Sequence, residues 1–132
     1  MQLTDRPSLS PAISPDGKLI AYAYLDDQRR KSIAVISVQG GQPAKTFPLP
    51  SNVLVDIGVG LRWTGDGKAV AYVDNPNGIS NLWTQPLDGG TPRQLTNFTS
   101  EEIFSYDVSR NGEIVVARGN LTSDVVLIRD VR

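Results

Sequence analysis

The chain of 132 residues contains no histidine and no cysteine. Without these side chains it cannot form a Ser-His-Asp or Cys-His nucleophile, a thiolate zinc site, a haem ligand of the usual kind or a disulfide. An excess of charge of one sign is also missing, because 13 Lys and Arg oppose 14 Asp and Glu, for a formal net charge of −1. Nucleic-acid binding needs a basic surface. The composition therefore predicts no metal, no cofactor, no nucleic-acid partner and no enzymatic activity.

Long hydrophobic runs are absent as well. No stretch approaches the roughly 18 consecutive apolar residues that cross a membrane. The segment Met1-Gln2-Leu3-Thr4-Asp5-Arg6 also lacks the basic and then apolar pattern of an export signal. We expect neither membrane insertion nor a signal peptide in this chain, and the sequence leaves its compartment open.

Turn-forming residues are abundant, with 12 Gly and 9 Pro in a chain that is 39% apolar, which favours a turn-rich β protein. The turn Ser14-Pro15-Asp16-Gly17 recurs as Thr64-Gly65-Asp66-Gly67 and, in degenerate form, as Ser109-Arg110-Asn111-Gly112, with spacings of 50 and 45 residues. In such a turn Asp binds its own backbone and Gly takes the left-handed conformation that closes a hairpin. Each turn is therefore expected to open a strand.

Short apolar segments of strand type flank each turn, and none of them shows a helical period over about 11 residues. The expected inner strands are 11–13, 61–63 and 106–108; the second strands are 18–24, 68–73 and 113–117; the third strands are 33–38, 82–87 and 125–129; and the outer strands are 44–47 and 93–96. These segments predict an all-β fold. Four antiparallel strands repeated every 45 to 50 residues are typical of β-propeller blades.

The motifs also carry a resemblance. Residues 11–22, Pro-Ala-Ile-Ser-Pro-Asp-Gly-Lys-Leu-Ile-Ala-Tyr, resemble the WD-like repeat of TolB-type propellers. Residues 81–90 and 123–130 are similar to the C-terminal propellers of bacterial serine/threonine protein kinases. The departures are Thr64-Gly65, where the family prefers Ser-Pro, and Arg110-Asn111, where it prefers Pro-Asp. The resemblance implies the fold rather than an activity, because such blades occur in the Tol system, in prolyl oligopeptidase-type peptidases and in sensor proteins.

The outer strands predict three blades that are permuted by one strand, because Gln2-Leu3-Thr4 repeats Gln94-Leu95-Thr96. The expected division of this single propeller segment is 1–7 as an outer strand, 8–50 as blade 1, 51–100 as blade 2, and 101–132 as blade 3, which lacks its outer strand. Two copies would then close a six-bladed homodimeric ring, the blade count that the resemblance implies. In that ring Gln2, Leu3 and Thr4 of one subunit complete the sheet beside Val125, Val126 and Leu127 of the other.

The inner strands hold the candidate binding residues. These strands line the channel of a propeller, so Arg62 and Asp107, which align with Ala12, are expected to face it while Trp63 and Val108 pack between blades. A ring with Arg and Asp suits a polar ligand or a peptide. An ion pair between adjacent blades is an equally good structural explanation.

Other polar motifs have simpler explanations. Asp16 and Asp66 are assigned to hairpin turns, in which a carboxylate accepts backbone amides. Residues 74–78 lack the spacing of an EF-hand and are assigned to a hairpin tip. Gly58-Val59-Gly60 lacks the third glycine and the helix of a dinucleotide site.

The expected function is a non-enzymatic interaction, scaffold or sensory module that self-assembles by strand exchange and presents loops to a protein or peptide ligand. Two alternatives stay open. The chain can be a non-catalytic fragment of a propeller-containing peptidase or lyase, or an excised or engineered propeller segment with no function of its own.

Overall fold

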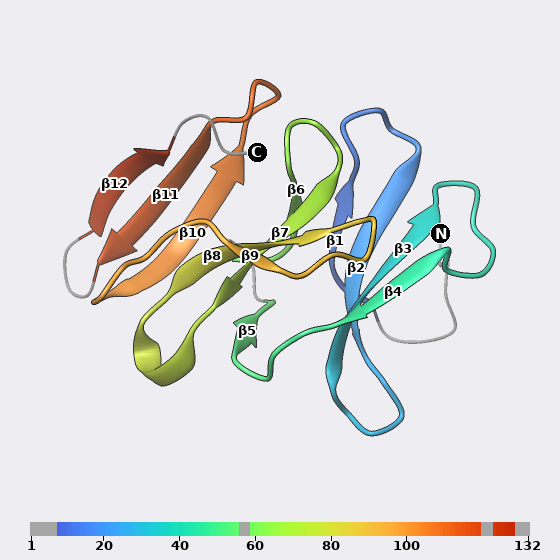
Figure 1. The fold of residues 1–132 in the computed structure, drawn as a ribbon, viewed down its shortest axis with the longest axis horizontal. Helices are drawn as coiled ribbons and strands as arrows, with labels where there is room; N and C mark the ends of the chain where they lie inside the picture. Colours follow the sequence, from blue (N-terminus) through green and yellow to red (C-terminus); the bar gives the residue numbers. More distant parts are fainter. Residues whose placement is uncertain (1–7, 56–58, 120–122, 129–132) are drawn as a thin grey trace.

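The computed structural model describes residues 8–55, 59–119 and 123–128, whose strands form three antiparallel sheets (Figure 1). Blade 1 has the order β1 (Ser8–Ile13), β2 (Leu19–Leu25), β3 (Lys31–Ser37) and β4 (Lys45–Pro48). In blade 2, β7 (Ala69–Asp74) pairs with β5 (Val53–Leu54), with β6 (Arg62–Trp63) and with β8 (Asn81–Pro86), and β8 pairs with β9 (Arg93–Gln94). Blade 3 has the order β10 (Glu102–Val108), β11 (Ile114–Gly119) and β12 (Ser123–Ile128).

The only helical element in the described residues is one 3-10 turn, η1 (Pro76–Gly78), in the hairpin between β7 and β8. No helix in the described part of the chain has the length and apolar character needed to cross a membrane.

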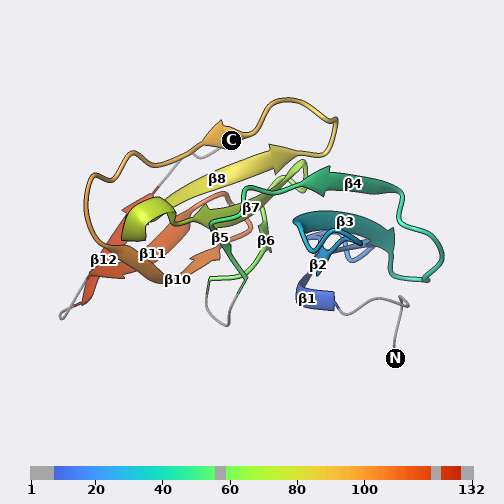
Figure 2. The same ribbon diagram turned by 90° about the horizontal axis from the view of Figure 1, so that it is seen from below.

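The three blades lie side by side as a fan (Figure 2). The inner strands β1 and β10 lie on one side of the fan and the outer strands β4 and β9 on the other, and β6 contacts both β1 and β10. The turns that follow the inner strands lie along the upper edge of Figure 1. The all-β propeller architecture with antiparallel blades, expected from the repeat, is confirmed.

The repeated turns have the chemistry that their residues predict. Gly17, Gly67 and Gly112 have φ angles of 75°, 72° and 87°. Asp16 Oδ1 accepts hydrogen bonds from the Ser14 hydroxyl (2.6 Å) and the Lys18 amide (2.9 Å). Asp66 makes the same two contacts in the second turn. These bonds, above all those from the Ser and Thr hydroxyls, hold the pKa of each carboxyl below its ordinary value.

The inner strands are less regular than the sequence predicts. A bulge interrupts β1 between Leu9 and Ala12, and another interrupts β10 between Ile103 and Ser105. In blade 2 residues 55–61 separate β5 from β6, although both strands pair with β7. The sequence located β6 but missed β5, which is a strand of two residues beyond this interruption.

The outer strand of blade 2 is shorter than the expected 93–96. It ends at Gln94, because the Thr96 side chain takes over the next contacts: Thr96 Oγ1 accepts from the Leu82 amide (2.9 Å) and donates to Asn81 Oδ1 (2.7 Å).

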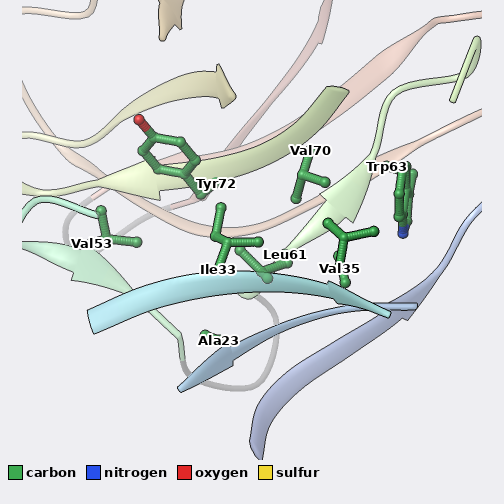
Figure 3. Close-up of a cluster of buried hydrophobic side chains, with 9 residues drawn as sticks. Ala23, Ile33, Val35, Val53, Leu61, Trp63, Val70 and Tyr72 are labelled. Atoms are coloured by element: carbon green, nitrogen blue, oxygen red, sulfur yellow. The ribbon is translucent and has the colours of Figure 1, made fainter. Parts of the chain in front are cut away.

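Apolar side chains fill the two spaces between neighbouring blades. The first core, drawn in Figure 3, consists of Ala21, Ala23, Ile33, Val35, Val53, Leu61, Trp63, Val70 and Tyr72. The second, between blades 2 and 3, consists of Val59, Ala71, Val73, Leu82, Ile103, Tyr106, Ile114 and Val116. Since side chains alternate along a strand, the third cluster of Tyr22, Ala34 and Ile36 lies on the face of blade 1 turned away from blade 2.

Candidate functional site

An open pocket of about 380 Å³ lies where the inner strands run into the three repeated turns. Each blade contributes to its lining: Ala12 and Pro15 from blade 1, Arg62 and Gly65 from blade 2, and Asp107 and Arg110 from blade 3, among others. The pocket is therefore assembled by the repeat itself, at the end of the inner strands.

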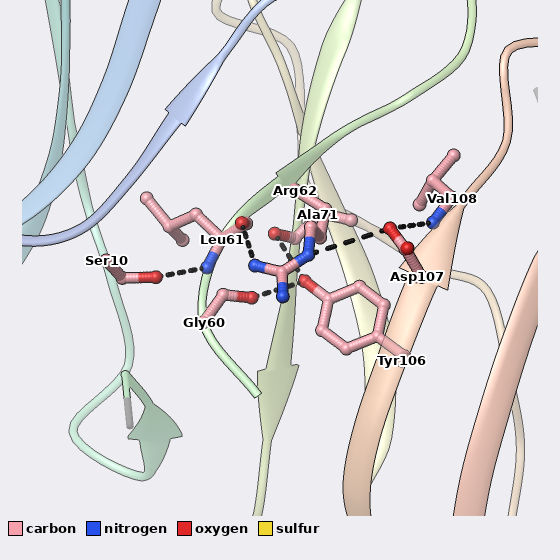
Figure 4. A network of polar contacts seen from close by, with 8 residues as sticks. All are labelled: Ser10, Gly60, Leu61, Arg62, Ala71, Tyr106, Asp107 and Val108. Carbon is pink, nitrogen blue, oxygen red and sulfur yellow. Dashed lines mark hydrogen bonds and ion pairs between the residues drawn. The ribbon is translucent and has the colours of Figure 1, made fainter. Parts of the chain in front are cut away.

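The structure brings together the two candidate binding residues, Arg62 and Asp107 (Figure 4). Nε of Arg62 lies 3.8 Å from Oδ1 of Asp107. The Arg62 Nη1 donates to the carbonyl of Leu61 (2.8 Å), and its guanidinium carbon lies 5.7 Å from the centre of the Tyr106 ring. The Arg62 side chain is half-buried, at 34% exposed, and that of Asp107 is 83% exposed, so the ion pair lies at the solvent-accessible surface.

The strand register gives the two residues equivalent places in their blades. Ala12 pairs with Ala21, Arg62 with Ala71, and Asp107 with Val115. Each of the three comes two residues before the Ser or Thr that begins its turn.

The third turn is one residue shorter than the other two. Ser14 Oγ and Thr64 Oγ1 each accept from the amide five residues later, whereas Ser109 Oγ accepts from Glu113, four residues later. This shortening keeps Asp107 in the register of Arg62 although the following strand begins one residue sooner.

The neighbours of the pair pack between blades, as the alternation predicts. Trp63 is buried in the first core, and its Nε1 donates to the carbonyl of Ala12 in blade 1 (2.8 Å). Val108 is half-buried against the second core.

Sequence reasoning missed three polar contacts that join adjacent blades. The Tyr106 hydroxyl lies 2.6 Å from the carbonyl oxygen of Gly60 and 3.0 Å from that of Ala71, both in blade 2, and burial raises its pKa. The Leu61 amide donates to Ser10 Oγ in blade 1 (2.6 Å). The sequence shows only a Tyr in an expected inner strand and a Ser beside Pro11, and neither residue type reveals its hydrogen-bond partner.

The residues expected to exchange between subunits are only partly within the described structure. Gln2, Leu3 and Thr4 lie outside the described residues. Val125, Val126 and Leu127 belong to β12, where they pair with Ala117, Val116 and Val115 of β11. In the described part of the chain β12 is the edge strand of blade 3.

Apart from the carboxylate of Asp107, the hydroxyls and carboxylates near the pocket are engaged in the turns. Ser14 and Thr64 bind the carboxylates of Asp16 and Asp66. Within the described residues, no three His, Cys, Asp or Glu side chains gather in one place. The accessible charges of the pocket are those of Arg62, Asp107 and Arg110.

Solved structures with a similar fold are propeller proteins. TolB from Acinetobacter baumannii superposes with a TM-score of 0.61 and 18% identity, over 96% of this chain and 30% of that chain. Puromycin hydrolase gives 0.66 and 18%, over 96% and 21%. The β-propeller domain of the Trilobed protease from Pyrococcus furiosus, which has an open velcro topology, gives 0.61 and 13%, over 92% and 38%.

The chain thus spans between about a fifth and two fifths of the length of these neighbours. No family model and no curated protein matches the sequence. The likenesses support a TolB-like β-propeller fold, whereas the similarity to kinase propellers stays a prediction.

Proposed function

We propose that the chain is a non-enzymatic β-propeller module that closes a six-bladed ring with a second copy of itself and offers its channel mouth to a polar ligand or a peptide. The observation that carries the ring is an exposed apolar side chain on the outward face at each end of the fan. On the blade 1 face turned away from blade 2, Ile13 is 66% exposed and pairs with Ile20. On the corresponding face of blade 3, Val115 is 43% exposed.

The alternation of side chains along a strand determines on which face of the blade each of these residues lies. Ile114 and Val116 pack against blade 2, so Val115 between them points away from it. In a propeller each such face is covered by the next blade, because a single blade cannot bury both of its apolar faces. Blade 3 of one copy can cover blade 1 of the other. A two-fold axis makes this contact twice, and the ring closes.

The interfaces within the chain supply the pattern for the contacts between copies. Between blades 1 and 2, Lys31 Nζ donates to the carbonyl of Val53 (2.7 Å), Lys45 Nζ donates to that of Leu87, and Trp63 donates to that of Ala12. Apolar cores with a few side chain to backbone bonds therefore hold blade to blade. A dimer with two such interfaces is expected to be obligate.

The ligand part of the proposal is supported by the exposure of the Arg62–Asp107 pair. An ion pair in solvent contributes about 0–1 kcal/mol to stability. The pair is therefore a weak structural element, and its two charges stay accessible in the pocket. A guanidinium and a carboxylate side by side suit a ligand that carries both an acidic and a basic or amide group.

The mass of the chain in solution tests the ring. Multi-angle light scattering at micromolar concentration is expected to give twice 14.3 kDa. Val115→Lys is expected to yield folded monomer, because it places a charge in the interface. Leu25→Lys is the matched control. Leu25 has a similar exposure of 39%, but it lies on the same face of blade 1 as Ala23, which is turned toward blade 2 of the same chain. A well-folded wild-type monomer contradicts the proposal.

A second candidate is a propeller segment of a peptidase-type enzyme, favoured by the hydrolase and the protease among the similar structures. In that case further blades of a longer chain cover the end faces. The same measurement separates the candidates, because only the first predicts a discrete dimer of this chain.

A further inference from the structure

We propose that Arg110 closes the ring by docking on the Ser14–Gly17 turn of the second copy, where Asp16 is its charge partner. The inference rests on the proposed dimer and names the contact that completes the channel mouth. It follows from a contact that the chain already makes twice.

In the first two turns, the second residue lies against the turn of the next blade. The Pro15 ring of blade 1 lies 3.7 Å from the position that a Cβ would take on Gly67 of blade 2. A Cβ on Gly65 of blade 2 would lie 2.7 Å from the carbonyl oxygen of Arg110 and 2.9 Å from the amide of Gly112 in blade 3. Gly65 thus lets the second and third turns meet backbone to backbone.

Arg110 holds this second position in the third turn, and the next turn in a closed ring is Ser14–Gly17 of the other copy. That turn is open on the side in question. Gly67 meets Pro15, whereas the Cβ position on the equivalent Gly17 has no heavy atom of the described residues within 4 Å, its two chain neighbours aside. Beside Gly17 of the partner turn there is therefore open space, at the place where Pro15 of the preceding blade lies beside Gly67.

The charges are complementary. The side chain at the second position is neutral and compact in blades 1 and 2, but in blade 3 it is an exposed guanidinium. Within the described residues Arg110 makes no ion pair. The partner turn carries Asp16, whose carboxylate is exposed and binds its own turn through Oδ1. Arg with a carboxylate is a strong and directional pair at an interface.

A hollow on blade 3 supports the same docking site. About 370 Å³ of open space lies beside the third turn on the face that carries Val115, lined also by Asp107, Ser109 and Glu113. The open pocket at the ends of the inner strands is lined by the second residue of every turn, Pro15, Gly65 and Arg110. The rim that one chain forms is therefore incomplete, and the partner turn would continue it.

A charge-reversal cycle tests the contact. The dimer dissociation constant is measured by sedimentation velocity for the wild type, Arg110→Asp, Asp16→Arg and the double variant. Each single reversal is expected to raise the constant about tenfold or more, since the two-fold axis makes the contact twice. The double reversal is expected to restore it to within about threefold of the wild type.

Asp66→Arg is the matched control. Asp66 makes the same hydrogen bonds within its turn as Asp16, but its neighbouring turns belong to its own chain. This variant is expected to lower the thermal unfolding temperature as Asp16→Arg does, with the dissociation constant unchanged. Circular dichroism checks that each variant is folded.

The outcomes separate this contact from the dimer. If the wild type is a dimer and neither single reversal changes the dissociation constant, the Arg110–Asp16 contact is overturned. The same holds if the double variant dimerises no more tightly than the single variants. In both cases the proposed function stands. A wild-type monomer overturns both.

Discussion

Replacing Tyr106 with Phe isolates the polar contact between blades 2 and 3. The hydroxyl is buried between the carbonyls of Gly60 and Ala71, at 2.6 and 3.0 Å, and phenylalanine keeps the ring that packs in the second core. The hydroxyl has one proton, which it can donate to only one of these carbonyl oxygens at a time, and the substitution removes that donor. Removing one partner of a buried hydrogen bond costs about 1–3 kcal/mol, so Tyr106→Phe is expected to lower the free energy of unfolding by that amount.

The assay is urea unfolding followed by tryptophan fluorescence, to which Trp63 in the first core and Trp83 packed against that core both contribute. The protein concentration is held fixed because the stability of a dimer depends on it. Tyr24→Phe is the control, since Tyr24 lies on the face of blade 1 turned away from blade 2, where its ring centroid is 6.1 Å from that of Tyr22. A loss below about 0.5 kcal/mol for Tyr106→Phe, or an equal loss for the control, would refute the hydrogen bond as an inter-blade contact.

Three further changes test the pocket and the turns. Arg62→Ala is expected to alter unfolding by less than about 1 kcal/mol, because its ion pair is exposed, while weakening the binding of charged peptides in calorimetry; a loss of several kcal/mol favours the structural role instead. Gly65→Ala is expected to destabilise by about 1–3 kcal/mol in the same urea assay, because its methyl group meets the backbone of the third turn. The pKa values of Asp16 and Asp66 are lowered on folding, so the stability they contribute is present above their ordinary value of 3.8 and is lost as the pH falls through the folded values. Unfolding followed from pH 6 to about pH 2 should show this loss, and Asp16→Asn should flatten it.

The turns and the main strands were predictable because their causes are local. Asp16 and Gly17 act within four residues of chain, through a side chain to backbone bond and a left-handed φ, and no other blade is needed to specify them. The continuous apolar run in Ala69–Asp74 likewise indicates, without reference to other blades, a strand that is buried on both faces. The fold class and the position of Arg62 and Asp107 on inner strands follow from these local signals.

The features that sequence reasoning missed depend on other blades. Gly65 looks like a departure from the family pattern, but its lack of a Cβ is explained by the backbone of Arg110 and Gly112, which lie 45 and 47 residues later in the chain. The shorter third turn was hidden for a different reason, which lies within blade 3 itself. Aligning Gly67 with Gly112 is correct within the motif, but the deletion follows the glycine and shows only in the pairing of Asp107 with Val115.

The interruption of the inner strand in blade 2 also explains how the blades are held in register. Between β5 and β6, backbone groups lack a partner in the strand ladder, and a buried backbone group needs a hydrogen-bond partner. In this propeller the neighbouring blade supplies it. The Leu61 amide and the Gly60 carbonyl belong to the interruption between β5 and β6, and they bind Ser10 of blade 1 and Tyr106 of blade 3. The segment that breaks the strand therefore fastens blade 2 to both of its neighbours, and it does so beside Arg62, so the position of the candidate binding residue depends on all three blades.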